Sequence, residues 1–138
     1  MVGAAFVARL VLAAALAVPT AATAQSRVAF PSSDAALTGG APTMLAGLVW
    51  TPPGLGPFPA MVMAHGCSGL WGRDGAPSAR HRDWAERFHR LGYVVLHVDS
   101  FRPRGVEATC GTPTRERVAR ATRERPHDVV AALAWLRA

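Results

Sequence analysis

Two apolar runs separated by an amphipathic segment constrain the fold of this chain most. Residues 60–65 (AMVMAH) and 93–98 (YVVLHV) are apolar without alternation, which is typical of strands buried on both faces. Between them, residues 78–91 carry apolar side chains at helical spacing and arginines on the other face. A strand, a helix and a strand in this order predict a right-handed parallel unit. We therefore expect a doubly wound, mostly parallel α/β sheet.

The boundaries of the helix in this unit follow from its flanking residues. Ser78 can cap its start and Gly92 its end. His81 and His89 flank the helix on its charged side, and we assign them no role. The predicted apolar stripe consists of Trp84, Ala85, Phe88 and Leu91.

The flanking segments extend this prediction. Residues 27–40 offer at most one short edge strand, and residues 44–50 form a strand that a Thr-Pro-Pro-Gly turn ends. After a loop over 101–113, Pro126 opens a second helix with Asp128 at the positive end of its dipole. The apolar stripe of that helix is predicted to be Val129, Val130, Leu133 and Leu136.

The N-terminus has the pattern of a secretory signal peptide. One arginine, an apolar run over residues 10–18, and Ala22-Thr23-Ala24 before Gln25 are its three regions. A membrane anchor would need about 20 apolar residues, and Arg9 and Pro19 bracket the run too closely. We expect residues 1–24 to be a leader and residues 25–138 one domain, periplasmic or secreted and free of the membrane after cleavage.

Export determines whether the two cysteines can form a disulfide. An oxidising compartment allows Cys67 and Cys110 to pair, whereas cytosolic thiols stay reduced. Closing a loop of about 43 residues stabilises a fold by roughly 4 kcal/mol in the chain-entropy model. The alternative is two buried, unpaired cysteines.

Composition and charge exclude several classes of protein. With 50% hydrophobic and 17% charged residues, the chain is neither collagen-like, nor a coiled coil, nor wholly disordered. The net charge of +6 rests on 15 arginines without a lysine, which a GC-rich coding sequence explains better than a selected basic surface. Arginine-rich runs at 80–90 and 115–125 accompany no nucleic-acid motif, so we expect no nucleic-acid partner.

The richest chemical signal is Met63-Ala64-His65-Gly66-Cys67-Ser68-Gly69, a strand that runs into His-Gly-x-x-Gly. It resembles the oxyanion loop of α/β-hydrolases, in which backbone N–H groups face the oxyanion of a tetrahedral intermediate. The resemblance implies that the Cys67 N–H is such a donor. It further implies that Gly66 and Gly69 shape the loop and that His65 braces it.

This loop is followed by the helix, by Gly92-Tyr93-Val94-Val95-Leu96, by residues 99–105 (DSFRPRG) and by residues 128–136. The succession resembles the dienelactone hydrolase family, and the resemblance extends from about Met44 to Ala138. The resemblance implies the N-terminal half of an α/β-hydrolase and hydrolysis of a small carboxylic ester or lactone without a cofactor. The family uses a Cys or Ser nucleophile in G-x-[CS]-x-G, with an Asp and a His later in the chain. None of these can be located here: Leu70 stands where an elbow starting at Gly66 needs its second glycine, and no Gly-x-Ser-x-Gly or Gly-x-Cys-x-Gly occurs elsewhere. We therefore expect an incomplete chain that is inactive alone.

Two departures from the family concern the substrate. Gly66 stands where the dienelactone hydrolases carry an acidic residue beside the loop histidine. The family also places a substrate-facing arginine just after the strand that here ends at Asp99, and Arg102 and Arg104 bracket that position. The resemblance implies that one of them meets an anionic substrate; the alternative is a surface or Asp-paired arginine.

Other interpretations of single residues remain open. A disulfide to Cys110 would remove the thiolate that a Cys67 nucleophile needs, and nothing nearby in the sequence identifies a base for Ser68. His65-x-Cys67 lacks a second ligand pair for a metal. Trp84, Trp135 and His97 are expected in the core.

The alternative function is a non-catalytic exported module that binds or assembles through an edge strand. In the family's strand order, the strand 60–65 lies between the strand 93–98 and the missing nucleophile strand. An exposed apolar edge, self-association and poor solubility would follow.

Overall fold

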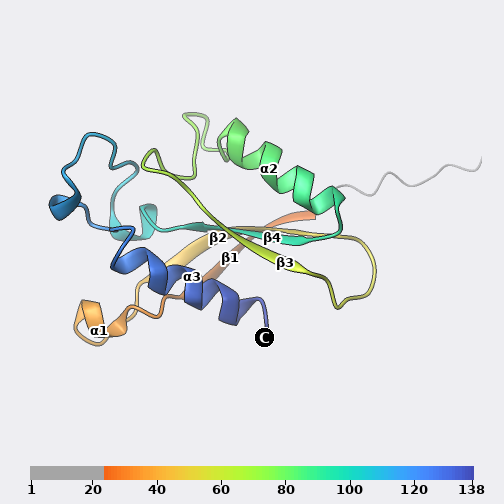
Figure 1. The fold of residues 1–138 in the computed structure, drawn as a ribbon, viewed down its shortest axis with the longest axis horizontal. Coiled ribbons are helices and arrows are strands. Elements are labelled where there is room, and N and C mark those ends of the chain that lie inside the picture. The colour runs from red at the N-terminus through yellow and green to blue at the C-terminus, as the bar shows by residue number, and fades with distance from the viewer. Residues whose placement is uncertain (1–23) are drawn as a thin grey trace, which may run out of the picture.

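A four-stranded mixed sheet with one long helix on each face forms the centre of the structure (Figure 1). The computed structural model describes residues 24–138, so the expected leader lies outside the described residues except for Ala24. Along the sheet the order is β1 (Ala24–Pro31), β2 (Met44–Thr51), β4 (Val94–Asp99) and β3 (Ala60–Ala64). The short elements are α1 (Ala35–Thr38), η1 (Arg102–Arg104) and η2 (Thr114–Glu116).

The strand directions correct the expectation of a mostly parallel sheet. β1 pairs with β2 and β2 with β4, both antiparallel, and only β3 and β4 run parallel. Parallel neighbours require a crossover of a dozen or more residues, and α2 (Ala79–Arg90) supplies one between β3 and β4. The predicted strand–helix–strand unit is thus confirmed, within a mixed and mostly antiparallel sheet.

Alternate residues of the strands build two cores. On one face, Leu45 and Val49 pack with Leu96 and with Ala131 of α3 (Glu124–Trp135). On the other face, Leu48 and Trp50 pack with Val95 and with Ala85 of α2. The two-residue period of a strand places these sets on opposite faces, and one helix covers each set. The sheet is therefore covered by one helix on each of its two faces.

The faces of α2 differ in part from the predicted stripe. Ala85 is fully buried and Phe88 packs against the core, but Trp84 is 48% and Leu91 70% exposed. His89, expected on the charged side, is buried instead. Trp84 and Leu91 are seven residues apart and therefore lie on the same side of α2, whereas the buried face is centred on Ala85 and His89. Gly92, with φ of 86°, ends the helix as expected.

The second helix departs from its predicted stripe in the same way. α3 begins at Glu124, two residues before the expected Pro126. Ala131 and Ala132 form its buried face, whereas Val130 and Leu133 are 57% and 40% exposed. Trp135 packs as expected, stacked on Phe30 with ring centroids 5.9 Å apart.

β3 is an edge strand, which corrects the prediction of a strand buried on both faces. Only its β4 side is paired among residues 24–138, and its five residues are exposed or half-buried. β1 forms the opposite edge and is longer than the short strand expected there. None of the described helices is long and apolar enough to cross a membrane.

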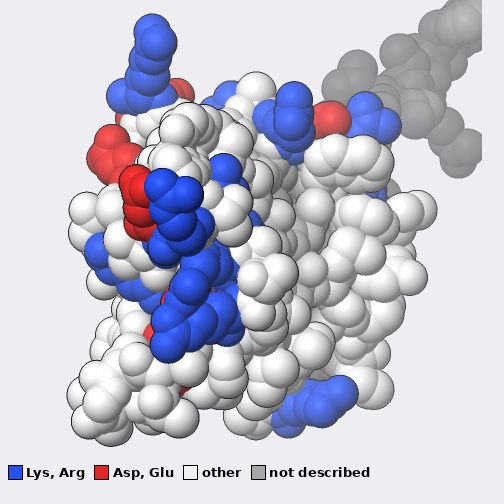
Figure 2. Space-filling model, turned by 60° about the vertical axis from the view of Figure 1, so that its left-hand side comes forward, with Lys and Arg blue, Asp and Glu red and all other residues white. Residues whose placement is uncertain are grey.

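Acidic and basic side chains are intermixed on the face that carries the segment between η1 and α3 (Figure 2). Several of its arginines pair with glutamates next to them or four residues away: Arg115 with Glu116, and Arg120 and Arg123 with Glu124. The positive charge of this face is therefore partly neutralised.

Candidate functional site

The glycine-containing loop at residues 66–69 leaves the sheet at the carboxyl end of β3. In open α/β sheets, ligands bind beyond the carboxyl ends of the strands. Because β4 runs parallel to β3, it also ends here, at Asp99. The loop therefore lies where this sheet architecture places binding sites.

His65 joins the ends of the two parallel strands. Its ring is buried, and its Nδ1 donates to the Gly66 carbonyl at 2.8 Å. Its Nε2 accepts from the Ser100 N–H at 3.1 Å, which assigns the ring proton to Nδ1. Burial lowers the pKa of His65, only partly opposed by the Gly66 carbonyl, so the neutral form is favoured. His65 thus braces the loop with a hydrogen bond of fixed direction.

That hydrogen bond determines where the Cys67 N–H points. The Gly66 carbonyl and the Cys67 N–H belong to one planar trans peptide and point in opposite directions. The carbonyl is held by His65 and also accepts from the Gly69 N–H at 3.2 Å. Among residues 24–138, no hydrogen bond involves the Cys67 N–H, and the residue is exposed. The loop therefore presents a free, oriented donor.

A second segment holds the loop from the other side. The predicted disulfide between Cys67 and Cys110 is confirmed, with Cα atoms 5.0 Å apart. The Thr109 N–H donates to the Cys67 carbonyl at 2.7 Å. Gly69 has φ of 80°, and a Cβ there would lie 2.3 Å from the Glu107 carbonyl oxygen, so only glycine fits. The loop is clamped between the strand ends and residues 107–110.

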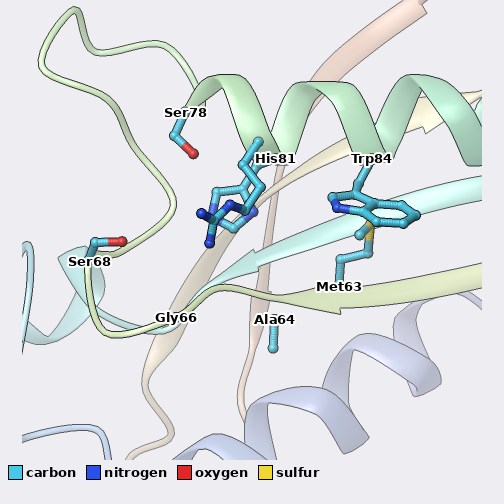
Figure 3. A pocket seen from close by; sticks show the side chains of 8 residues that line it. Met63, Ala64, Gly66, Ser68, Ser78, His81 and Trp84 are labelled. Atoms are coloured by element: carbon cyan, nitrogen blue, oxygen red, sulfur yellow. The ribbon is translucent and has the colours of Figure 1, made fainter.

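A cavity of about 490 Å³ borders the loop (Figure 3). Gly66 and Ser68, the neighbours of Cys67, line it on the loop side, and Met63 lines it from β3. The side chains of Ser78, just before α2, and of His81 and Trp84 on α2 also line it, with Trp84 extending from the helix toward β3. Arg80 completes the lining. The free Cys67 amide thus lies beside a cavity with polar and apolar walls.

Two more histidines connect α2 to the loop and to the sheet. The Nε2 of His81 donates to the Gly69 carbonyl at 3.3 Å, and the Nε2 of His97 donates to the His81 carbonyl at 3.1 Å. His97 is buried as expected, although its Nδ1 has no partner among the described residues. Burial, reinforced by the charge of neighbouring His81, lowers the pKa of His97 to about 4. His81, to which sequence assigned no role, is a support of the loop.

Acidification is expected to destabilise the protein through His97. The unfolded state takes up its proton near pH 6.5, whereas the folded state does so near pH 4. Between these values the unfolded chain binds more protons, so stability is complete above about pH 6.5 and falls as the pH is lowered through this window. Urea denaturation between pH 4 and 7 measures it. His97→Gln should flatten the dependence, and an unchanged slope in the variant would contradict the assignment.

The two arginines expected near a substrate have different surroundings. Arg104 is nearly buried and paired with Asp34 and Asp128 at 2.9 and 2.7 Å, so it is the Asp-paired arginine of the alternative interpretation. Arg102 is exposed, 3.7 Å from Glu107, with its guanidinium over the Trp71 ring. Of these two arginines, only Arg102 is exposed and could meet a ligand.

No nucleophile with a base is assembled in the part of the chain that the structure describes. Neither Ser68 nor another serine or cysteine side chain is hydrogen-bonded to a histidine there, and the Cys67 sulfur is in the disulfide. Over the same residues, no group of three His, Cys, Asp or Glu side chains could hold a metal ion. The site therefore offers oriented donors and a cavity.

Sequence reasoning did not identify the residues that line the cavity from the side of α2. Ser78, His81 and Trp84 recur every three residues along the helix, but we assigned Ser78 to capping, Trp84 to packing and His81 no role. Comparisons of the chain with protein-family models, with curated proteins and with solved structures gave no match.

Proposed function

We propose that this chain carries the oxyanion loop of an exported hydrolase of carboxylic esters or lactones. The observation that carries the proposal is the free Cys67 N–H, oriented by His65 and flanked by two residues that line a cavity, Gly66 and Ser68. In this reaction a nucleophile adds to the substrate carbonyl, and negative charge develops on the carbonyl oxygen. Expulsion of the alcohol gives an acyl-enzyme, and water then releases the acid. The oriented N–H stabilises the oxygen in both tetrahedral intermediates.

The sheet order supports the finer proposal that this is the N-terminal half of an α/β-hydrolase. β3 lies beside parallel β4 with its outer edge unpaired among the described residues, which is where the family's nucleophile strand would add. The nucleophile, the acid and the catalytic histidine would then come from outside residues 24–138. The disulfide supports export, because such bonds persist in oxidising compartments.

Removing the Cys67 N–H tests the proposal. In a Cys110→Ser background, Cys67→Pro is expected to reduce kcat for p-nitrophenyl acetate about 10²- to 10³-fold relative to Cys67→Ser, the loss typical of one oxyanion donor. Both variants lack the disulfide, and Gly66 before the proline limits the backbone conflict. Because residues 24–138 hold no assembled nucleophile, both variants should be produced and exported by the native host, in the form in which the protein exists there. Absence of ester hydrolysis by that protein, or equal kcat values for the two variants, would sink the proposal.

The open edge of β3 favours a second candidate function, a non-catalytic module that assembles by strand pairing. Unpaired backbone groups of an edge strand form a template for another chain. Beside that edge, Ala64 and Val129 line an apolar groove of about 440 Å³, and Leu133, 40% exposed, lies one helical turn after Val129 on α3. An extended segment added to β3 would cover these side chains.

Self-association through this edge is expected to depend on α3. Leu133→Glu, at an exposed position, should shift an oligomer toward monomer in light-scattering measurements over a concentration series, because a charge would be buried at the contact. Leu55→Glu is the matched control, since Leu55 is 99% exposed in the loop before β3 and does not lie on α3. A wild-type protein that stays monomeric and soluble at high concentration would contradict the assembly function.

A further inference from the structure

The cavity beside the oxyanion loop combines polar groups that lack partners with an aromatic wall. Among residues 24–138, the hydroxyls of Ser68 and Ser78 form no hydrogen bond, and Arg80 forms no ion pair. None of the residues that line the cavity is acidic. His81 donates to the Gly69 carbonyl, and burial lowers its pKa, so Arg80 is the cation of the lining. The polar side of the cavity therefore suits an anionic group.

The opposite side of the cavity suits a flat ring. Trp84 is 48% exposed, although large aromatic side chains usually bury more of their surface, and it stacks on Phe88 at 5.9 Å with an interplanar angle of 24°. Met63 lines the same side from β3. Indole and thioether groups both make favourable contacts with aromatic rings. A volume of about 490 Å³ lies within the range of small-molecule sites.

We propose that this cavity is a binding site for aromatic carboxylates and their esters. The ring lies between Trp84 and Met63, and the carboxylate is held by Arg80 with the Ser68 and Ser78 hydroxyls. The proposal deepens the proposed function, because an ester bound here has its carbonyl near the Cys67 N–H. In hydrolysis, water supplies OH to the acyl carbon and H to the leaving alkoxide, and the aromatic acid remains in the cavity as its carboxylate. Binding of the acid requires no nucleophile, so the site can be tested independently of catalysis.

Three probes of similar size separate charge from ring. Benzoate carries both features, benzamide only the ring and cyclohexanecarboxylate only the charge. We expect benzoate to bind with a millimolar Kd, about five- to tenfold tighter than either of the others, in NMR titrations of the purified protein. The amide signals of residues 66–69 and 78–81 should shift. Absence of benzoate binding, or shifts confined to other segments, would overturn the proposal.

Matched variants separate the contribution of the charge from that of the aromatic contact. Arg80→Gln should weaken benzoate about tenfold and abolish its advantage over benzamide, since a charge-assisted hydrogen bond is lost. Trp84→Leu should abolish the advantage of benzoate over cyclohexanecarboxylate. Arg82→Gln, an exposed arginine of α2 outside the lining, is the control for general charge and should leave all three affinities unchanged. Equal weakening by Arg80→Gln and Arg82→Gln would overturn the site.

The binding site and the proposed hydrolase activity can each be rejected without the other. Benzoate binding with the expected variant effects, without hydrolysis of methyl benzoate or p-nitrophenyl acetate by the exported protein, would support the site and reject the hydrolase. Hydrolysis of these esters without benzoate binding would support the hydrolase and overturn this site.

Discussion

Arg104→Met is expected to lower the free energy of unfolding by about 3 to 5 kcal/mol, the cost of removing one partner from a buried ion pair. The guanidinium donates to Asp128 twice, to Asp34, and to the Ser100 carbonyl, at 2.7 to 2.9 Å. Both carboxylates are fully buried, and the substitution would leave them without their counter-charge. Urea denaturation followed by circular dichroism measures the loss.

The electrostatics of this cluster agree with that expectation. Burial works against the charge of Arg104, but hydrogen bonds to Asp128 and Asp34 outweigh it and raise its pKa. Burial also opposes the charge of Asp34, yet hydrogen bonds from Thr43 and Arg104 lower its pKa. Ser32 donates to Asp128 at 2.7 Å, so the cluster joins the end of β1, η1 and α3. Its loss should therefore affect elements that are distant in sequence.

Two variants control the Arg104 experiment. Arg102→Met removes an exposed arginine two residues away and should cost less than about 1 kcal/mol, since exposed ion pairs contribute little. Arg104→Met combined with Asp34→Asn and Asp128→Asn should be less destabilised than the sum of the single changes, because the unpaired charges are gone. A loss below about 1 kcal/mol for Arg104→Met would show that the cluster is not stabilising.

Opening the Cys67–Cys110 disulfide is the second large effect. The bond spans 43 residues, and releasing a loop of that length costs about 4 kcal/mol in the chain-entropy model. Cys67→Ser, Cys110→Ser and chemical reduction of the wild type should therefore lower the free energy of unfolding by the same amount. Denaturant unfolding with and without reductant measures it. An unchanged midpoint on reduction would contradict the expectation.

The disulfide should also act locally on the loop at residues 66–69. Besides the bond, the Thr109 N–H and the tight contact of Gly69 with Glu107 hold the loop against residues 107–110. Reduction is thus expected to accelerate hydrogen exchange in residues 66–70 and 107–110 more than in β2. Uniform acceleration would mean that the bond stabilises only the whole fold.

The sequence alone determined the features that depend on neighbours along the chain. The apolar runs and the helical period between them predicted β3, α2 and β4, and glycine at position 92 predicted the helix end. The glycine spacing after His65 marked the loop that the structure places at the strand ends. These signals are local because backbone conformation is selected by side chains within a few residues.

Only the tertiary structure decided which strands pair, which helix faces are covered and which charges meet. The expected parallel sheet became mixed because β1 and β2 add antiparallel to β4, a choice that apolar patterning does not encode. Asp34 and Arg104 are 70 residues apart and Arg104 and Asp128 are 24 apart, so no sequence period connects them. Ser68 and His81 line one cavity for the same reason: folding brings the loop after β3 close to α2, and side chains become partners through space.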